Sequence, residues 1–192
     1  MIATFLRSSM LTSYGVCEHK SFIEYNIGIK GPANKSAVVG TVVHKVMELL
    51  AKQKLCLQNN EDSFVDDVLG KVDVLNCQPM YLANQVIEKE DMLDEDKKDC
   101  IKQIKKAITF QNGIYDPRNC TIVAVEKPFD CIINKPWAKY SFDTPDGKLE
   151  GQLMLRGTID LIIKEDEQTY EIRDYKTGRV WDWGKNKEKN EE

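Results

Sequence analysis

Two strand-like runs joined by a short polar stretch constrain this chain more than any other feature. Residues 157–163 and 169–176 are rich in β-branched, aromatic and alternating side chains. The charged residues 164–168 between them are typical of a turn. The pattern predicts an antiparallel hairpin.

The register of this hairpin decides whether its acidic residues meet. Successive strand side chains point to opposite faces, so Asp174 and Lys176 point the same way. If the turn is centred on Glu167, Asp160 lies directly opposite Asp174 and shares its face. A slip of one residue would turn Asp160 to the other face. The hypothesis of a shared site therefore requires a loop with an odd number of residues.

Two acids and a lysine at one end of a hairpin form a chemically useful group. They can hold a divalent cation and a water beside a phosphate, which is suited to hydrolysis of a phosphodiester bond. The alternative is an ordinary hairpin whose acids lie on a solvated face. Asp160 interrupts an apolar run, where an acid is costly without a partner or a function, and this favours the site.

An amphipathic helix is predicted over residues 36–54. Its apolar side chains form one stripe: Val39, Val42, Val43, Val46, Met47, Leu49 and Leu50. Gly40 and His44 lie together at the edge of that stripe. Gly40 is a poor helix former, but it would let another segment or a substrate approach beside His44. The alternative for His44 is a core-edge histidine bonded to a carbonyl.

The rest of the chain predicts an α/β domain over residues 1–180. Residues 60–112 carry apolar side chains at helical spacing, including a run from Phe64 to Val72, and are predicted to form a helical insertion. A β-branched strand follows from Thr121 and ends in Glu126. Residues 181–192 are charged, without apolar periodicity, and are predicted to be a flexible tail.

Composition limits the class of protein. The 192 residues are 42% apolar, enough for a single core, and the net charge of −4 is not that of a generally basic nucleic-acid binder. A local cationic groove would suffice, and the lysines of residues 97–106 either line one or form a solvated helix face. The six cysteines lack zinc-site spacing. The absence of a secretory signal and of a span of roughly 18 apolar residues predicts a cytoplasmic protein with no membrane partner.

The order of these motifs resembles the PD-(D/E)XK nuclease superfamily. The residues that carry the resemblance are Gly40-x-x-x-His44, Glu126, Gly157-x-x-Asp160 and Asp174-Tyr175-Lys176-Thr177-Gly178. The chain is most similar to the RecB-like branch, which includes CRISPR-associated and phage RecB-like exonucleases. Ser8-Ser9 with Tyr14, Cys17 and Tyr25 also resembles that branch.

The resemblance implies a role for each residue. Asp160 and Asp174 would be metal-binding acids, and His44 would be a further metal ligand. Lys176 would orient the attacking water or stabilise charge on the phosphate, and Glu126 would lie near the metal or behind its ligands. The implied ion is Mg²⁺ or Mn²⁺. No iron–sulfur cluster is expected, because Cys17 has no C-terminal cysteine triplet to accompany it.

The resemblance also implies a fold and an activity. The fold is a mixed central β-sheet flanked by helices, as in the restriction-endonuclease-like core. The activity is metal-dependent DNA cleavage by an exonuclease acting on ends or single strands in recombination, repair or phage DNA processing. The family's next helix, with its Q-x-x-x-Y motif, and a further strand do not follow residues 174–178. The alternative is therefore an impaired or split DNA-binding fragment that needs a C-terminal partner or self-association at an open sheet edge.

Overall fold

The computed structural model describes residues 4–31, 35–70 and 72–177, together with the backbone of residues 181–182 and 187–188. The chain divides into two compact units. Unit 1 comprises residues 1–32 and 126–159, and unit 2 comprises residues 33–125 and 160–192. Two long strands, β2 and β5, contribute residues to both units.

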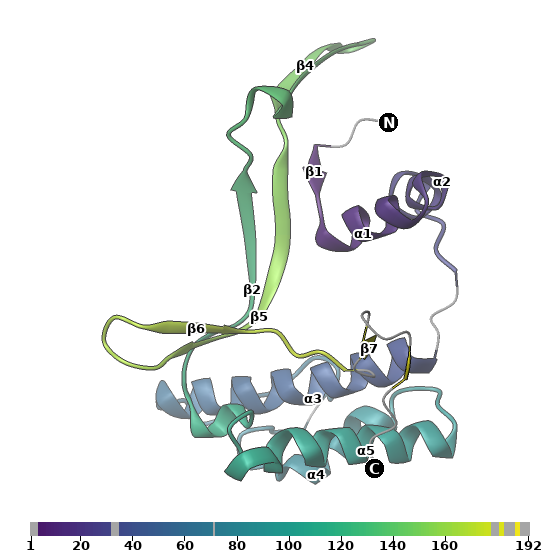
Figure 1. Ribbon diagram of the computed structural model, residues 1–192. Helices are drawn as coiled ribbons and strands as arrows, with labels where there is room; N and C mark the ends of the chain where they lie inside the picture. The colour runs from purple at the N-terminus through teal and green to yellow at the C-terminus, as the bar shows by residue number, and fades with distance from the viewer. Residues whose placement is uncertain (1–3, 32–34, 71, 178–180, 183–186, 189–192) are drawn as a thin grey trace. The chain divides into compact units, whose positions relative to one another are not determined.

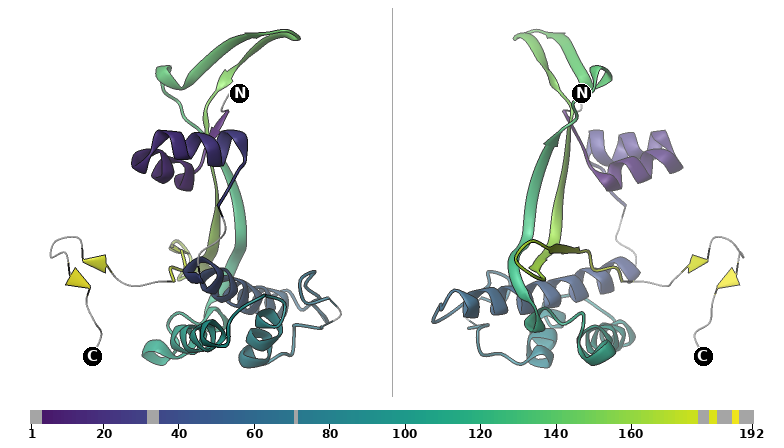
Figure 2. Two further views of the ribbon diagram at one scale, coloured as in Figure 1. Left: turned by 90° about the vertical axis from the view of Figure 1, so that its right-hand side faces the viewer. Right: turned by 60° about the vertical axis from the view of Figure 1, so that its left-hand side comes forward.

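Unit 1 combines a helical N-terminal segment with extended β-structure. The N-terminal elements are β1 (Phe5–Leu6), α1 (Ser8–Val16), α2 (Glu18–Ser21) and the π-helix η1 (Phe22–Ile27). The later elements are the second half of β2 (Thr121–Ile132), the 3₁₀ turn η4 (Pro136–Ala138), β3 (Lys139–Thr144), β4 (Gly147–Gln152) and the first half of β5 (Met154–Lys164). Strands β3 and β4 pair antiparallel and form a hairpin that connects the end of β2 to the start of β5 along the chain (Figure 2).

Unit 2 contains the longest helix and the strand pair that carries the acidic motif. Its helices are α3 (Lys35–Gln58), α4 (Pro79–Ile87) and α5 (Asp94–Thr109), with the 3₁₀ turns η2 (Phe110–Asn112) and η3 (Pro117–Asn119). Its strands are the first half of β2, the second half of β5, β6 (Tyr170–Arg173), β7 (Trp181–Asp182) and β8 (Lys187–Glu188). Figure 1 shows α4 and α5 on one side of α3 and β6 on the other.

The main sheet is mixed, as the sequence predicts for an α/β protein. Its strand order is β1-β5-β2, and β6 pairs with β5. The β1–β5 pair is parallel and the β5–β6 pair is antiparallel. The helices and the mixed sheet are consistent with a PD-(D/E)XK core.

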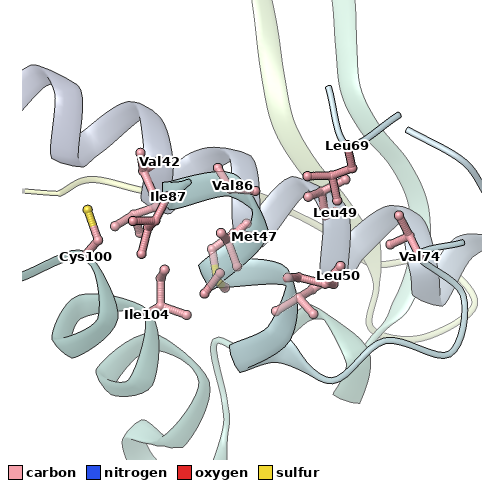
Figure 3. Close-up of a cluster of buried hydrophobic side chains, with 14 of the residues drawn as sticks. Val42, Met47, Leu49, Leu50, Leu69, Val74, Val86, Ile87, Cys100 and Ile104 are labelled. Carbon is pink, nitrogen blue, oxygen red and sulfur yellow. The ribbon is translucent and has the colours of Figure 1, made fainter. Parts of the chain in front are cut away.

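Helix α3 begins and ends close to the limits predicted from its apolar stripe, and it extends to Gln58. The chain leaves the helix through Asn60, whose φ of +58° is in the left-handed region that ends many helices. One face of α3 packs against α4 and α5 through a cluster that includes Val42, Met47, Leu50, Val86 and Ile104 (Figure 3). The valine and leucine positions of the stripe are buried in this cluster.

The opposite side of α3 packs on the strands. Ala51 of α3 forms a second buried cluster with Ile122 of β2 and with Leu161 and Ile163 of β5. At the helix end, the Gln58 amide donates to the Ile122 carbonyl at 2.9 Å and accepts from the Ile122 N–H at 2.9 Å. Helix α3 therefore joins a helical layer to the strands that carry the acidic residues.

Residues 61–78 differ from the sequence prediction, because no helix forms in the described part of this segment. The predicted periodic run is instead an irregular loop with an isolated bridge between Val65 and Asp73. Its polar side chains bond the backbone: the Asp73 carboxylate accepts the Phe64 and Leu75 N–H groups at 3.0 and 3.1 Å. Aspartates that bond nearby N–H groups stabilise turns in competition with helix, and this competition outweighs the helical spacing of the apolar residues here.

The loop is anchored on α3 by an ion pair whose aspartate, Asp66, is buried. The Lys45 ammonium lies 2.9 Å from Asp66 Oδ2 and 3.1 Å from Glu48 Oε1. Burial alone would raise the pKa of Asp66, but the bonds from Lys45 and from the Val68 N–H outweigh it and hold that pKa below its ordinary value. An aspartate with a lowered pKa stabilises the folded state above its ordinary pKa, and the contribution is lost as pH falls through the lowered value.

An Asp66→Asn variant is expected to be about 2 kcal/mol less stable at neutral pH, because it leaves Lys45 without its buried carboxylate. The deficit should stay constant down to about pH 5 and shrink below about pH 4, where the wild-type carboxyl becomes protonated. Urea unfolding of both proteins across this pH range measures the difference in their free energy of unfolding. The exposed neighbour Asp67 is the matched control, and equal losses in Asp66→Asn and Asp67→Asn would contradict the role of the ion pair.

Other sequence predictions concern the tail, the cysteines and the membrane. Residues 183–186 and 189–192 of the predicted flexible tail lie outside the described residues, and the backbones of β7 and β8 pair antiparallel. All six cysteines are free thiols. Within the described ranges, none of the helices combines the length and apolar character that a membrane span requires.

Candidate active site

Asp160 is the centre of the candidate site in unit 2. Its Oδ2 atom accepts the backbone N–H of Tyr175 at 2.9 Å. The same oxygen lies 3.3 Å from Nδ1 of His44, and the Asp160 side chain is 18% exposed. The carboxylate that the sequence marks as out of place in an apolar strand therefore has partners on α3 and on the segment after β6.

The hairpin has the register that the hypothesis of a shared site requires. Leu161 pairs with Arg173 and Lys164 pairs with Tyr170, which leaves a loop with an odd number of residues. Continued by one residue, this register places Asp160 opposite Asp174. The ladder stops at Arg173, and the Asp160 carboxylate bonds the next free N–H, that of Tyr175.

Gly40 and His44 lie one turn apart on α3, as predicted, and Gly40 allows a close approach. A Cβ atom at Gly40 would lie 2.7 Å from Oγ1 of Thr177, which is shorter than a normal contact. The segment that follows β6 therefore passes directly over the helix at Gly40. This approach also carries Tyr175 past His44, whose ring meets the tyrosine edge-on at a centroid distance of 6.2 Å.

Tyr175 and Thr177 are contact residues to which the sequence pattern assigned no role. Tyr175 packs against both hydrophobic clusters of unit 2. Burial raises the pKa of its hydroxyl above the ordinary value, and the hydroxyl has no bonding partner among the described residues. The sequence does contain a signal for the partly buried position of Tyr175. Side chains alternate along an extended segment, so Tyr175 faces away from the side that carries Asp174 and Lys176.

Asp174 and Lys176 form a separate, exposed pair. The Lys176 ammonium donates to Asp174 Oδ1 at 2.7 Å. The strand predicted to reach Lys176 ends at Arg173, so this pair lies in the segment after β6. Their side chains are 56% and 81% exposed. The described residues thus contain an Asp160–His44 contact and, next to it in sequence, a solvent-accessible carboxylate–ammonium pair.

Glu126, the remaining predicted site residue, lies in β2 where unit 1 resumes. Its φ of +48° is in the left-handed region. A residue other than glycine in that region costs on the order of 1 kcal/mol, so the strand is locally strained at this point. Its role near a metal ion remains a prediction.

The donors suit the ion that the motif implies, although the described residues do not form a complete metal cage. No group of three His, Cys, Asp or Glu side chains in the described ranges is close enough together to hold a metal ion. Asp160 and Asp174 supply carboxylate oxygens, which Mg²⁺ and Mn²⁺ prefer, and His44 supplies an imidazole nitrogen, which Mn²⁺ also accepts. Magnesium sites commonly use one or two carboxylates and complete their coordination with water and substrate phosphate.

A Gly40→Ala variant is expected to lose about tenfold in cleavage rate, because the added methyl displaces Thr177 and with it the adjacent Lys176. Its free energy of unfolding should change by less than about 1 kcal/mol, since alanine's higher helix propensity offsets the clash. Single-turnover cleavage and urea unfolding measure the two effects. A Gly40→Ala/Thr177→Ala double variant should regain activity, and a fully active single variant would contradict the proposed crowding.

Comparison with known proteins identifies the family of the chain. A family model of the PD-(D/E)XK nuclease superfamily matches residues 8–191. A search of curated proteins and a search of solved structures gave no match. The matched range spans nearly the whole chain. The chain belongs to the PD-(D/E)XK nuclease superfamily, whose members hydrolyse phosphodiester bonds and typically use divalent metal ions.

Proposed function

We propose that this protein is a metal-dependent DNA nuclease whose nuclease domain spans residues 1–180. The observation that carries the proposal is the environment of Asp160. In a member of a nuclease superfamily, its carboxylate lies 3.3 Å from His44 Nδ1 and accepts the N–H of Tyr175, the residue between Asp174 and Lys176 in the sequence. A carboxylate held in this way is preorganised, so it can bind an ion without first losing side-chain freedom.

Each residue has a distinct part in the proposed reaction. Asp160, Asp174 and His44 would hold Mg²⁺ or Mn²⁺. The bound ion supplies a Lewis acid for the phosphoryl oxygen and lowers the pKa of a coordinated water. Lys176 would place its ammonium against the negative charge that develops on the phosphate. The Tyr175 N–H holds one oxygen of Asp160, which leaves the other oxygen available.

The finer assignment is a RecB-like exonuclease that acts on DNA ends or single strands. Its support is the histidine one turn after Gly40 on a long helix, together with Gly157-x-x-Asp160 and the Asp174-Tyr175-Lys176-Thr177 run. A role in recombination, repair or phage DNA processing follows from the same resemblance. Glu126 is proposed to act behind the metal ligands.

The test is cleavage of end-labelled single- and double-stranded DNA and of matched RNA, with Mg²⁺, Mn²⁺ or EDTA. Wild-type protein should cleave DNA only with metal, and Asp174→Asn should be inactive while remaining folded by circular dichroism. Asp143→Asn, an exposed aspartate on the β3–β4 hairpin, is the matched control. Stepwise shortening from one end would support an exonuclease, whereas internal cuts would support an endonuclease. A folded chain that binds metal but never cleaves would contradict the proposal.

A further inference from the structure

A pocket in unit 1 lies outside the candidate active site. It has a volume of about 630 Å³, on the scale of the clefts that hold small ligands. Three segments line it: Arg7–Ser9 at the start of α1, Pro128–Asp130 in β2, and Arg156–Thr158 in β5. None of these residues has a part in the proposed cleavage chemistry.

The local backbone explains why these segments meet. Phe5 and Leu6 of β1 pair in parallel with Met154 and Leu155 of β5, so α1 starts directly beside Arg156. Among the lining residues, a Cβ atom at Gly157 would lie 2.7 Å from the Phe129 ring. Glycine at this position therefore lets the aromatic ring approach the backbone of β5 closely.

Positively charged side chains outnumber negatively charged ones in the lining of the pocket. Two guanidinium groups lie close to the Phe5 ring, with Arg7 Cζ 5.3 Å and Arg156 Cζ 4.8 Å from its centroid. Arg156 is paired with Asp130 through two bonds of 2.7 and 2.8 Å. Arg7 has no carboxylate partner among the described residues, so the lining carries a net positive charge.

Hydroxyl and backbone donors lie beside this charge. Ser8 and Ser9 are the first residues of α1, and Thr158 lines the pocket from β5. Arg7, the residue before α1, gives the helix no side-chain cap bond. The first-turn N–H groups add a partial positive charge next to the Arg7 guanidinium. A ligand for this lining needs several acceptor oxygens and a negative charge.

We propose that the pocket binds a phosphate group of a nucleic-acid strand, with Arg7 as the principal charged contact. Arginine donors form paired bonds with phosphate oxygens, and exposed Phe129 offers an apolar surface for an adjacent sugar or base. The proposal rests on the proposed function in one respect: the bound strand is taken to be the substrate of the nuclease. The pocket adds affinity for the strand and takes no part in the cleavage step.

The first test measures how oligonucleotide binding depends on salt concentration. Binding is monitored by fluorescence anisotropy in the presence of EDTA. Arg7→Gln is expected to weaken binding about tenfold and to make the slope of log affinity against log salt shallower by about 0.7 to 0.9, the value for one lost phosphate contact. Lys139→Gln removes one charge from β3, outside the pocket, and is the matched control. An unchanged slope in Arg7→Gln, or an equal loss in both variants, would overturn the proposal.

A second variant separates binding from folding. Ser8→Asp places a carboxylate in the first turn of α1, where it should raise the melting temperature slightly through the helix dipole. The same carboxylate should repel a phosphate and weaken oligonucleotide binding about tenfold. A stable Ser8→Asp variant with wild-type affinity would contradict the site.

Three further outcomes identify the source of the phosphate and separate the two proposals. A mononucleotide that displaces the oligonucleotide at equal concentration would show a free-nucleotide site instead. Binding that depends on Arg7, without any cleavage by wild-type protein, would refute the nuclease activity and leave the pocket standing. Cleavage with binding unaffected by Arg7→Gln and Ser8→Asp would refute the pocket alone.

Discussion

An Asp160→Asn variant is expected to cleave DNA on the order of 10³-fold more slowly than the wild type, a loss of about 4 kcal/mol of transition-state stabilisation. Asparagine keeps an oxygen that can accept the Tyr175 N–H, which the native carboxylate accepts at 2.9 Å. It loses the negative charge with which Asp160 would bind a divalent ion. The fold should therefore survive while metal-dependent cleavage disappears.

The measurement for Asp160→Asn is single-turnover cleavage over a range of Mn²⁺ concentrations, beside urea unfolding of the same preparation. The metal requirement should rise together with the loss of rate. Glu167→Gln, an exposed residue in the turn of the same hairpin, removes one charge without touching Asp160 and should behave as the wild type. Wild-type rates in Asp160→Asn would remove this residue from the site, whatever its contacts with His44.

A Lys176→Met variant is expected to lose about 10²-fold in cleavage rate, because its ammonium is proposed to stabilise the charge that develops on the phosphate. Its free energy of unfolding should change by less than about 1 kcal/mol. The Lys176 side chain is 81% exposed and its pair with Asp174 is open to solvent, and exposed ion pairs contribute little to stability. The rate at saturating DNA, compared with the rate at low DNA, separates a loss of catalysis from a loss of binding.

The chain offers a close control for this substitution. Lys148 forms an ion pair with Glu150 on β4, and both side chains are more than half exposed. Lys148→Met therefore removes an exposed ion pair of the same kind from unit 1 and should leave the cleavage rate unchanged. Equal losses in Lys176→Met and Lys148→Met would indicate a general charge effect on DNA binding.

The hairpin was predictable from the sequence because its signals are local. The polar turn around Glu167 and the apolar runs on either side specify a hairpin, and the pairing of Leu161 with Arg173 gives it the register that the shared-site hypothesis requires. Helix α3 was predictable for the same reason, since its valine and leucine stripe repeats at helical spacing. The identities of the acidic residues and of His44 follow from these two elements and the family pattern.

Residues 61–78 show where local signals mislead. Phe64 and Val72 have helical spacing, yet aspartate side chains satisfy the backbone of a turn. The Gln53 amide of α3 donates to the carbonyls of Val74 and Leu75 at 2.9 and 2.8 Å. Such bonds come from residues distant in the sequence, so apolar periodicity alone does not reveal them.

The sequence alone was enough to specify the hairpin, the α3 stripe and the residue types of the candidate site, because side-chain alternation and helical spacing are properties of a single element. The structure decided between the possible hairpin registers. Only the tertiary structure could place the Asp160 carboxylate against the Tyr175 N–H and His44, and Thr177 against Gly40. It alone revealed the pocket between the start of α1 and the strands of unit 1. These features depend on distances between segments far apart in the chain, which are set by the packing of the helices and strands.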